Sequence, residues 1–170
     1  RNLWRFLHRY LNAPIYPDTF KGAGLIVGGG YGTDPFEDKD NEIKIEAIAR
    51  AAKYYGEGTI DNPDNFSNDP VYIYGGAKDT TVPTIFQDGQ EEYYNNYNAN
   101  VMKVIKEKNG HYVPSEFFHN EFNNEFYGIL MGREQNWDRC EAPDCTYDMA
   151  GDMFTHLFSN LPTNAVSSLN

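Results

Sequence analysis

The chain has 170 residues, of which 40% are hydrophobic and 23% are charged, which suits one packed domain or part of a larger one and excludes wholesale disorder. Its 14 basic residues against 25 acidic residues give a net charge of -11, which repels nucleic acids and anionic membranes, so neither is an expected partner. No apolar run approaches the roughly 20 residues that a membrane span needs, so no membrane insertion is expected.

The first half of the chain predicts a helix, a strand and a second helix. Residues 2–11 place apolar side chains at helical spacing, in a chain that opens with Arg1 rather than Met and so suggests a processed or truncated start. Residues 23–27 form an apolar run between glycines, typical of a strand buried on both faces. Residues 42–55 repeat apolar side chains every three to four positions, which predicts an amphipathic helix. The polar segment 61–70 is expected to be a surface loop.

The second half continues the alternation of strands and helices. We expect a strand at 71–74 stopped by Gly75-Gly76, a helix at 84–97 weakened at Gly89, a strand at 100–105, an irregular segment at 112–135 and a helix at 148–158. Strands alternating with helices indicate βαβ units, and hence an α/β fold with a mostly parallel sheet flanked by helices. Three strands make a thin sheet, so the chain is predicted to be one half of a larger α/β domain.

Two chemically active residues follow neighbouring strands. Asp79 comes shortly after the predicted strand at 71–74, and His111 comes after the strand at 100–105. In open parallel sheets, active groups gather beyond the carboxyl ends of strands, and an acid followed by a histidine is the later part of the chain order Ser…Asp…His. The carboxylate would hold the imidazole, and the imidazole would activate a hydroxyl nucleophile. Taken singly, Asp79 could be only a turn residue and His111 only a surface histidine, but together they favour a hydrolase.

The other histidines and the loops offer weaker candidates. His8 and His156 lie on amphipathic helices, where packing or solvation is the simpler role, and His119 is a reserve candidate. The glycines at 28–32 do not form a dinucleotide-binding fingerprint and indicate a tight loop instead. The acidic segment 34–42 lacks the spacing of a calcium loop and is expected to be solvated.

Cysteine usage and one sequon point to an oxidising compartment. Cys140 and Cys145 are too few for a structural zinc site and lack the C-x-x-C spacing. A small local disulfide is favoured, with two free thiols as the alternative, and a disulfide would place the protein in a secreted, extracellular or lumenal setting. Asn65 begins an N-x-S glycosylation sequon in a polar loop, so a glycoprotein is expected.

Three sequence blocks resemble a known family. Residues 16–24 (YPDTFKGAG), residues 70–83 (PVYIYGGAKDTTVP) with 109–114 (NGHYVP), and residues 145–153 (CTYDMAGDM) are similar, in order and spacing, to the C-terminal half of the secreted poly(3-hydroxybutyrate) depolymerase type of esterase, within the α/β-hydrolases. The resemblance runs from about Tyr16 to Pro162. It implies that Asp79 is the triad acid and His111 the triad base, and it supports a Cys140–Cys145 disulfide. No cofactor and no metal are expected.

The resemblance also divides the chain into segments of a single partial domain. These are residues 1–15, a helix on the nucleophile side; 16–110, the strands and helices with the acid loop; 111–146, the histidine loop and an aromatic, lid-like segment; 147–162, the C-terminal helix; and 163–170, the tail.

The nucleophile is the element that this sequence lacks. A triad hydrolase needs a serine in G-x-S-x-G at a strand-to-helix elbow, and the chain has no such motif. None of its serines follows an apolar strand and precedes a helix; they are Ser67, Ser115, Ser159, Ser167 and Ser168. The resemblance therefore implies that the serine and the oxyanion-hole amides lie upstream, in an N-terminal half of the same hydrolase.

Two functions of different class remain open from the sequence. In the first, the chain contributes to a serine-dependent carboxylic-ester hydrolase acting on an ester or polyester. In the second, it is a catalytically silent relative that serves as an extracellular structural or binding component. The aromatic segment that contains Phe117, Phe118 and Phe122 is either a surface that contacts substrate or partner, or part of the packed core under a lid.

Overall fold

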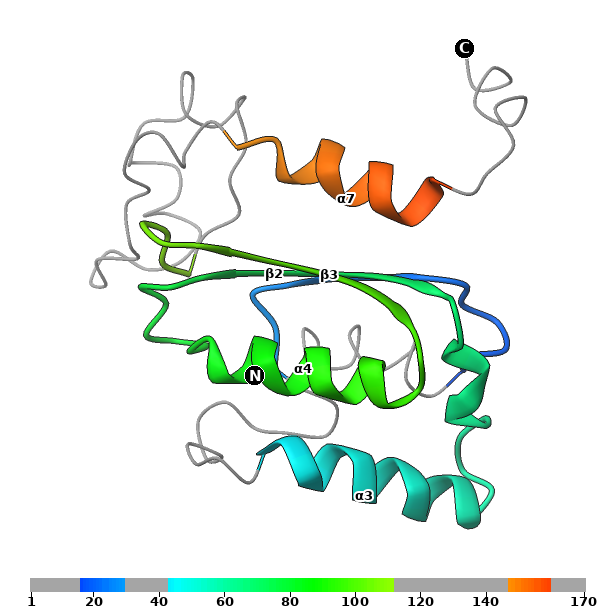
Figure 1. Cartoon of the computed structure of the whole chain (residues 1–170). Coiled ribbons are helices and arrows are strands. Elements are labelled where there is room, and N and C mark those ends of the chain that lie inside the picture. Colours follow the sequence, from blue (N-terminus) through cyan, green and yellow to red (C-terminus); the bar gives the residue numbers. More distant parts are fainter. Residues whose placement is uncertain (1–15, 30–42, 112–146, 160–170) are drawn as a thin grey trace, which may run out of the picture.

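A parallel sheet forms the centre of the molecule in the computed structural model, which describes residues 16–29, 43–111 and 147–159 (Figure 1). Strand β1 (Ala23–Ile26) pairs with β2 (Pro70–Gly76), and β2 pairs with β3 (Asn100–Lys106). The strand order is β1-β2-β3, and both pairings are parallel. All three strands therefore end at the same rim of the sheet.

Helices cover both faces of this sheet. Helices α3 (Ile43–Gly56) and α4 (Ile85–Asn96) lie on one face, and α7 (Met149–Phe158) lies on the other (Figure 1). The chain alternates β1, α3, β2, α4 and β3, which is the order that the hydrophobic periodicity predicts. The predicted α/β class, with a parallel sheet flanked by helices, is confirmed.

The central strand β2 builds the core because its side chains alternate between the two faces. Val71 and Ile73 belong to the cluster under α3 and α4, whereas Tyr72 and Tyr74 belong to the cluster under α7. All four are at most 1% exposed. A strand covered on both sides needs apolar or aromatic residues at every position, which is what the run V-Y-I-Y supplies.

The segment between α3 and β2 is more ordered than its polar composition suggests. Residues 61–70 were expected to form a surface loop, but Pro63–Phe66 forms a 3-10 helix, η1, whose first turn is capped by the Asn62 side chain. Phe66 is 2% exposed and packs edge-on against the rings of Tyr93 and Tyr94. The expectation of a solvated loop is therefore wrong for this part, because one aromatic residue turns it into a cover for the core.

Three further expectations need correction. Only Leu25 of β1 is buried, since β1 lies at the edge of the three described strands, so burial on both faces is wrong for the rest of that strand. Gly75 and Gly76 do not stop β2 but form its last two residues. Gly89 does not interrupt α4, where it lies buried within a continuous helix.

Several predicted segments lie outside the described residues. These are the helix at 2–11, the acidic loop at 34–42, the irregular segment at 112–135 and the tail at 163–170. Within the described part, no helix is long and apolar enough to cross a lipid bilayer.

Candidate functional site

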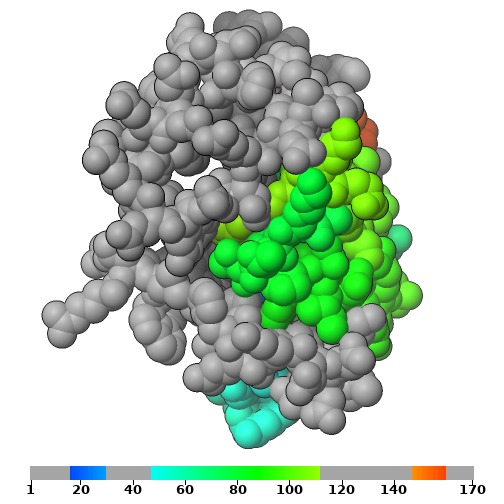
Figure 2. Space-filling model, turned by 90° about the vertical axis from the view of Figure 1, so that its left-hand side faces the viewer, coloured from blue at the N-terminus to red at the C-terminus, as the bar shows by residue number. Residues whose placement is uncertain are grey.

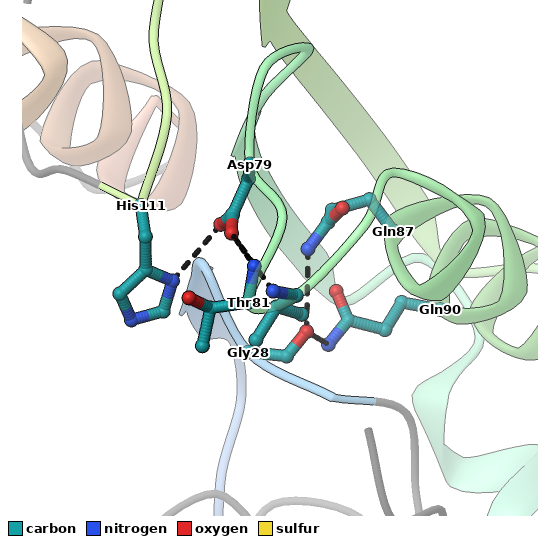
Figure 3. A network of polar contacts seen from close by, with 7 residues as sticks. Gly28, Asp79, Thr81, Gln87, Gln90 and His111 are labelled. Atoms are coloured by element: carbon teal, nitrogen blue, oxygen red, sulfur yellow. Dashed lines mark hydrogen bonds and ion pairs between the residues drawn. The ribbon is translucent and has the colours of Figure 1, made fainter. Parts of the chain in front are cut away.

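The loop that follows β2 fixes one buried carboxylate. Asp79 lies three residues beyond the end of β2, and its side chain is 0% exposed. Its Oδ1 atom accepts hydrogen bonds of 2.8 Å from the backbone N–H groups of Thr81 and Val82. These two bonds form a side-chain turn that holds the carboxylate in one orientation. The second oxygen, Oδ2, is directed toward the neighbouring strand end (Figure 3).

His111 follows β3 and meets this carboxylate. Its Nδ1 atom lies 2.9 Å from Asp79 Oδ2, and its side chain is 21% exposed. Because an ionised carboxylate can only accept, Nδ1 carries the proton of this hydrogen bond. The other ring nitrogen, Nε2, points away from Asp79 (Figure 3). The structure thus brings together the two residues that the sequence singles out, at the ends of two adjacent parallel strands.

Backbone hydrogen bonds join the loop that carries Asp79 (the acid loop, residues 77–84) to the loop that leads from β3 to His111 (the histidine loop, residues 107–111). Lys78 N–H donates to the Asn109 carbonyl at 2.9 Å, and Ala77 N–H donates to the Lys106 carbonyl at 2.9 Å. At Gly76 a Cβ atom would lie 2.1 Å from the Asn109 carbonyl oxygen, so only glycine allows the loops to meet this closely. In Figure 2, which views the rim at the carboxyl ends of the strands, the surfaces of the acid loop with α4 and of the end of β3 adjoin.

A buried asparagine anchors the histidine loop from below. Asn109 is 0% exposed, and its side-chain Nδ2 donates to the Tyr74 hydroxyl at 2.7 Å. The Tyr74 ring stacks on Tyr147, with 6.2 Å between the ring centroids. Lys106, the last residue of β3, places its ammonium 3.6 Å from the centroid of the Tyr147 ring. The loop that carries His111 is therefore held against the aromatic side chains of Tyr74 and Tyr147.

The start of α7 is attached to these aromatic side chains through the Tyr147 hydroxyl. The Tyr147 hydroxyl donates to Asp152 Oδ2 at 2.5 Å and lies 2.9 Å from the Tyr72 hydroxyl. Burial, assisted by the Asp152 carboxylate and the Tyr72 hydroxyl, raises the pKa of Tyr147, so its phenol stays protonated. Asp148 caps α7 by accepting from Gly151 N–H at 2.8 Å.

Two glutamines of α4 hold the loop that follows β1. Gln87 Nε2 donates to the Gly28 carbonyl at 3.3 Å, and Gln90 Nε2 donates to the Gly28 and Gly29 carbonyls at 3.0 and 2.6 Å. Sequence reasoning missed both glutamines and also missed Asn109 and Tyr74. A signal was present, since Gln87 and Gln90 lie three residues apart on the face of α4 that carries Phe86 and Tyr94.

The remaining predicted site residues are distributed as follows. Cys140, Cys145, Phe117, Phe118 and Phe122 lie outside the described residues, so the disulfide and the aromatic contact surface stay predictions. Asn65 lies in η1, and its side-chain Nδ2, the atom that a glycan would modify, donates to Asp18 Oδ1 at 2.6 Å. Its glycosylation also stays a prediction.

The described serines and the described second histidine lie away from the Asp79–His111 pair. Ser67 precedes β2, and His156 Nε2 donates at 2.9 Å to the carbonyl of Asn100, the first residue of β3. Ser159 follows α7 and donates to the His156 carbonyl at 3.1 Å. These groups are at the amino ends of the strands, the opposite rim. Among the described residues, no three histidine, cysteine or acidic side chains cluster as metal ligands would.

Comparison with known proteins adds a relative and two solved structures. No family model matches the chain. A poly(3-hydroxybutyrate) depolymerase of Delftia acidovorans is 26% identical over an alignment that covers 86% of this chain and 30% of that protein. The crystal structure of the PHB depolymerase of Penicillium funiculosum matches with a TM-score of 0.59 and 20% identity, and a serine-to-alanine PHB depolymerase complexed with an R3HB trimer matches with a TM-score of 0.56 and 21% identity.

These alignments cover most of this chain but only part of each relative. The two structural matches cover 84% and 83% of the chain and 44% of each solved protein. The chain therefore spans about a third to a half of the proteins that it matches. The resemblance drawn from the sequence blocks is confirmed: the chain is similar in sequence to a poly(3-hydroxybutyrate) depolymerase and shares the α/β fold of two solved ones.

Proposed function

We propose that this chain supplies the acid and the base of a serine-dependent carboxylic-ester hydrolase of the polyhydroxybutyrate depolymerase type. The observation that carries the proposal is the 2.9 Å contact between Asp79 Oδ2 and His111 Nδ1 at neighbouring strand ends. The similarity to a poly(3-hydroxybutyrate) depolymerase supports an ester as the substrate, and more specifically a polyester of 3-hydroxybutyrate units.

The proposed chemistry starts from the tautomer that Asp79 selects. With the proton on Nδ1, the Nε2 atom of His111 has a lone pair and takes the proton of a serine hydroxyl as its oxygen attacks the ester carbonyl. The buried carboxylate stabilises the imidazolium that forms, which then protonates the departing alcohol. Water attacks the acyl-enzyme, with His111 again as the base, and the carboxylic acid leaves.

The nucleophile and the oxyanion hole are proposed to lie upstream of Arg1 or on another chain. The sequence has no G-x-S-x-G motif, and the two serines in the described part, Ser67 and Ser159, are at the rim opposite His111. The partial coverage of the relatives agrees with this division. We also propose that the protein is secreted, in keeping with the predicted Cys140–Cys145 disulfide.

The test replaces His111 in the full-length protein. We expect His111→Ala to lower hydrolysis of a 3-hydroxybutyrate oligomer by about 10^4-fold, the order of effect seen when a triad is broken. His156→Ala is the matched control, because His156 is a second histidine at the opposite rim, and it should change turnover by no more than a few-fold.

A fluorophosphonate probe checks where the nucleophile lies. It should label the full-length protein on a serine outside residues 1–170, and a labelled serine within these residues would contradict the proposed division. If the full-length wild-type protein neither reacts with the probe nor hydrolyses any ester, the catalytically silent alternative, an extracellular structural or binding component, replaces the enzyme.

A further inference from the structure

The loop after β1 is held in place by side chains rather than by backbone alone. Gly28 is buried, and its carbonyl oxygen accepts from the amide groups of both Gln87 and Gln90 (Figure 3). The Gly29 carbonyl accepts from Gln90 as well. Three hydrogen bonds from one helix therefore converge on two consecutive peptide groups.

Burying these two glutamine side chains does not favour the stability of the fold. Gln87 is 0% exposed and Gln90 is 3% exposed, and the Oε1 atom of each is buried with no hydrogen-bond partner among the described residues. A buried acceptor without a partner costs free energy, which an apolar side chain of similar size would avoid. What the amides contribute in return is the fixed position of the Gly28 and Gly29 carbonyls.

The turn that they hold is strained. Val27 has φ 43, in the left-handed region, which is unfavourable for a β-branched residue. Its N–H donates to the Tyr74 carbonyl at 2.9 Å, so one side of the turn is attached to β2 while the glutamines attach the other. Backbone strain of this kind persists only where the surroundings over-determine the conformation, and it gathers at functional sites.

The end of strand β2 leaves room for the Gln87 side chain. At Gly75 a Cβ atom would lie 2.9 Å from Gln87 Cδ, so a side chain there would displace Gln87. The acid loop leads directly from β2 into α4, and its Val82 N–H donates to Asp79. Helix α4 therefore follows directly on the acid loop, and its glutamines also hold the Gly28–Gly29 backbone. Gly28 follows β1 at the same rim of the sheet at which Asp79 and His111 follow β2 and β3 (Figure 3).

We propose that Gln87 and Gln90 are positioning residues that fix the Gly28–Gly29 backbone as a rigid wall of the ester-binding site. This inference rests on the proposed hydrolase function and deepens it. Because the wall lies at the rim that also carries the imidazole of His111, the proposed base, its position would set how the chain of the ester lies relative to His111. The glutamines act through the backbone and do not themselves react.

The experiment compares two substrates in the full-length protein. Gln90→Met keeps the length of the side chain and removes its donors. We expect the ratio of kcat/KM between a short and a longer 3-hydroxybutyrate oligomer to change at least threefold, through KM, with an unaltered dependence of kcat on pH. A ratio of two substrates does not depend on the fraction of folded enzyme, so a purely structural defect leaves it unchanged. Asn95→Met, at an exposed position of α4, is the control and should leave the ratio as in the wild type.

A second variant alters the Gly28–Gly29 backbone without changing Gln87 or Gln90. Val27→Pro fixes φ near about -65°, outside the left-handed region that the turn needs, and removes the N–H that donates to Tyr74, so it should shift the substrate ratio in the same direction as Gln90→Met. An unchanged ratio in an active Gln90→Met or Val27→Pro enzyme overturns the inference while leaving the hydrolase intact. A full-length wild-type protein that hydrolyses neither oligomer overturns the proposed function itself, and the inference with it.

Discussion

At the scale of single residues, Gly76 connects the two halves of the site. Its missing side chain lets the carbonyl oxygens of Asn109 and Gly110 approach to within 2.1 and 2.4 Å of where a Cβ atom would lie. Both contacts are with backbone, which cannot rotate out of the way as a long side chain could. The separation between the acid loop and the histidine loop therefore depends on this one position.

We predict that Gly76→Ala destabilises the protein by about 1–3 kcal/mol, the range for overpacking a closely packed site. It should also lower ester hydrolysis, since the His111 loop must move outward. Gly56→Ala is the control, because Gly56 ends α3 with nothing within 4 Å of an added Cβ. Chemical denaturation of both variants measures the difference, and equal stabilities would contradict the prediction.

Asp69 offers a test based on pH. Burial raises the pKa of its carboxyl above 3.8, and Lys21, at 3.9 Å, offsets this only in part. Between the unfolded and the folded pKa, the folded state binds the proton more tightly, so its stability falls as pH rises through that window. Asp69→Asn removes this effect.

We therefore expect Asp69→Asn to gain stability relative to the wild type at pH 7, with the advantage shrinking as pH falls toward 3. Thermal unfolding of the wild type and the variant across that range measures it. An advantage that grows on acidification would show that another group dominates at this position.

Some residues of the site could be predicted from their letters and others could not. Asp79 and His111 were predictable because each follows a strand, and the ends of parallel strands meet. Asn109 and Gln90 were not, because a polar letter in a loop or on a helix normally indicates solvent, and burial depends on tertiary contacts. The partners that hold the pair are therefore visible only once the elements are assembled.

At the scale of elements, η1 acts as a cover over one end of the core. Phe66 of η1 contacts the rings of Tyr93 and Tyr94, which α4 contributes. The sequence does not indicate this role, because the residues around Phe66 are polar and their composition is typical of a loop. The strands and helices were predictable since their apolar periods are long, whereas a single buried aromatic leaves no period.

We predict that Phe66→Ala lowers the free energy of unfolding by about 3–5 kcal/mol, the cost of removing a buried aromatic side chain. Phe154→Ala is the matched control, because Phe154 is 53% exposed on α7 and its loss should cost less than about 1 kcal/mol. Denaturant midpoints of the two variants give the comparison. A small effect at Phe66 would mean that the core closes without η1.

At the scale of the whole molecule, the order of the elements carried the most information. Alternation of strand and helix predicted a parallel sheet, and the structure has three parallel strands covered on both faces. The sequence could not predict which helix covers which face or that Tyr147 would bridge α7 to the histidine loop, because these depend on how distant segments pack. The sequence also predicts one half of a larger domain, and this stays a prediction; the chain covers 44% of each solved structure that it matches.

The two oxygens of the Asp79 carboxylate have separate duties, since Oδ1 shapes the chain and Oδ2 meets the imidazole. A glutamate at this position is one methylene longer, so in the same backbone geometry its carboxylate would be displaced from both sets of partners, and keeping the charge alone does not conserve the site. In the proposed hydrolase, selection for a faster or slower base would therefore act on His111 and its surroundings, while the backbone around Asp79 fixes the proposed acid.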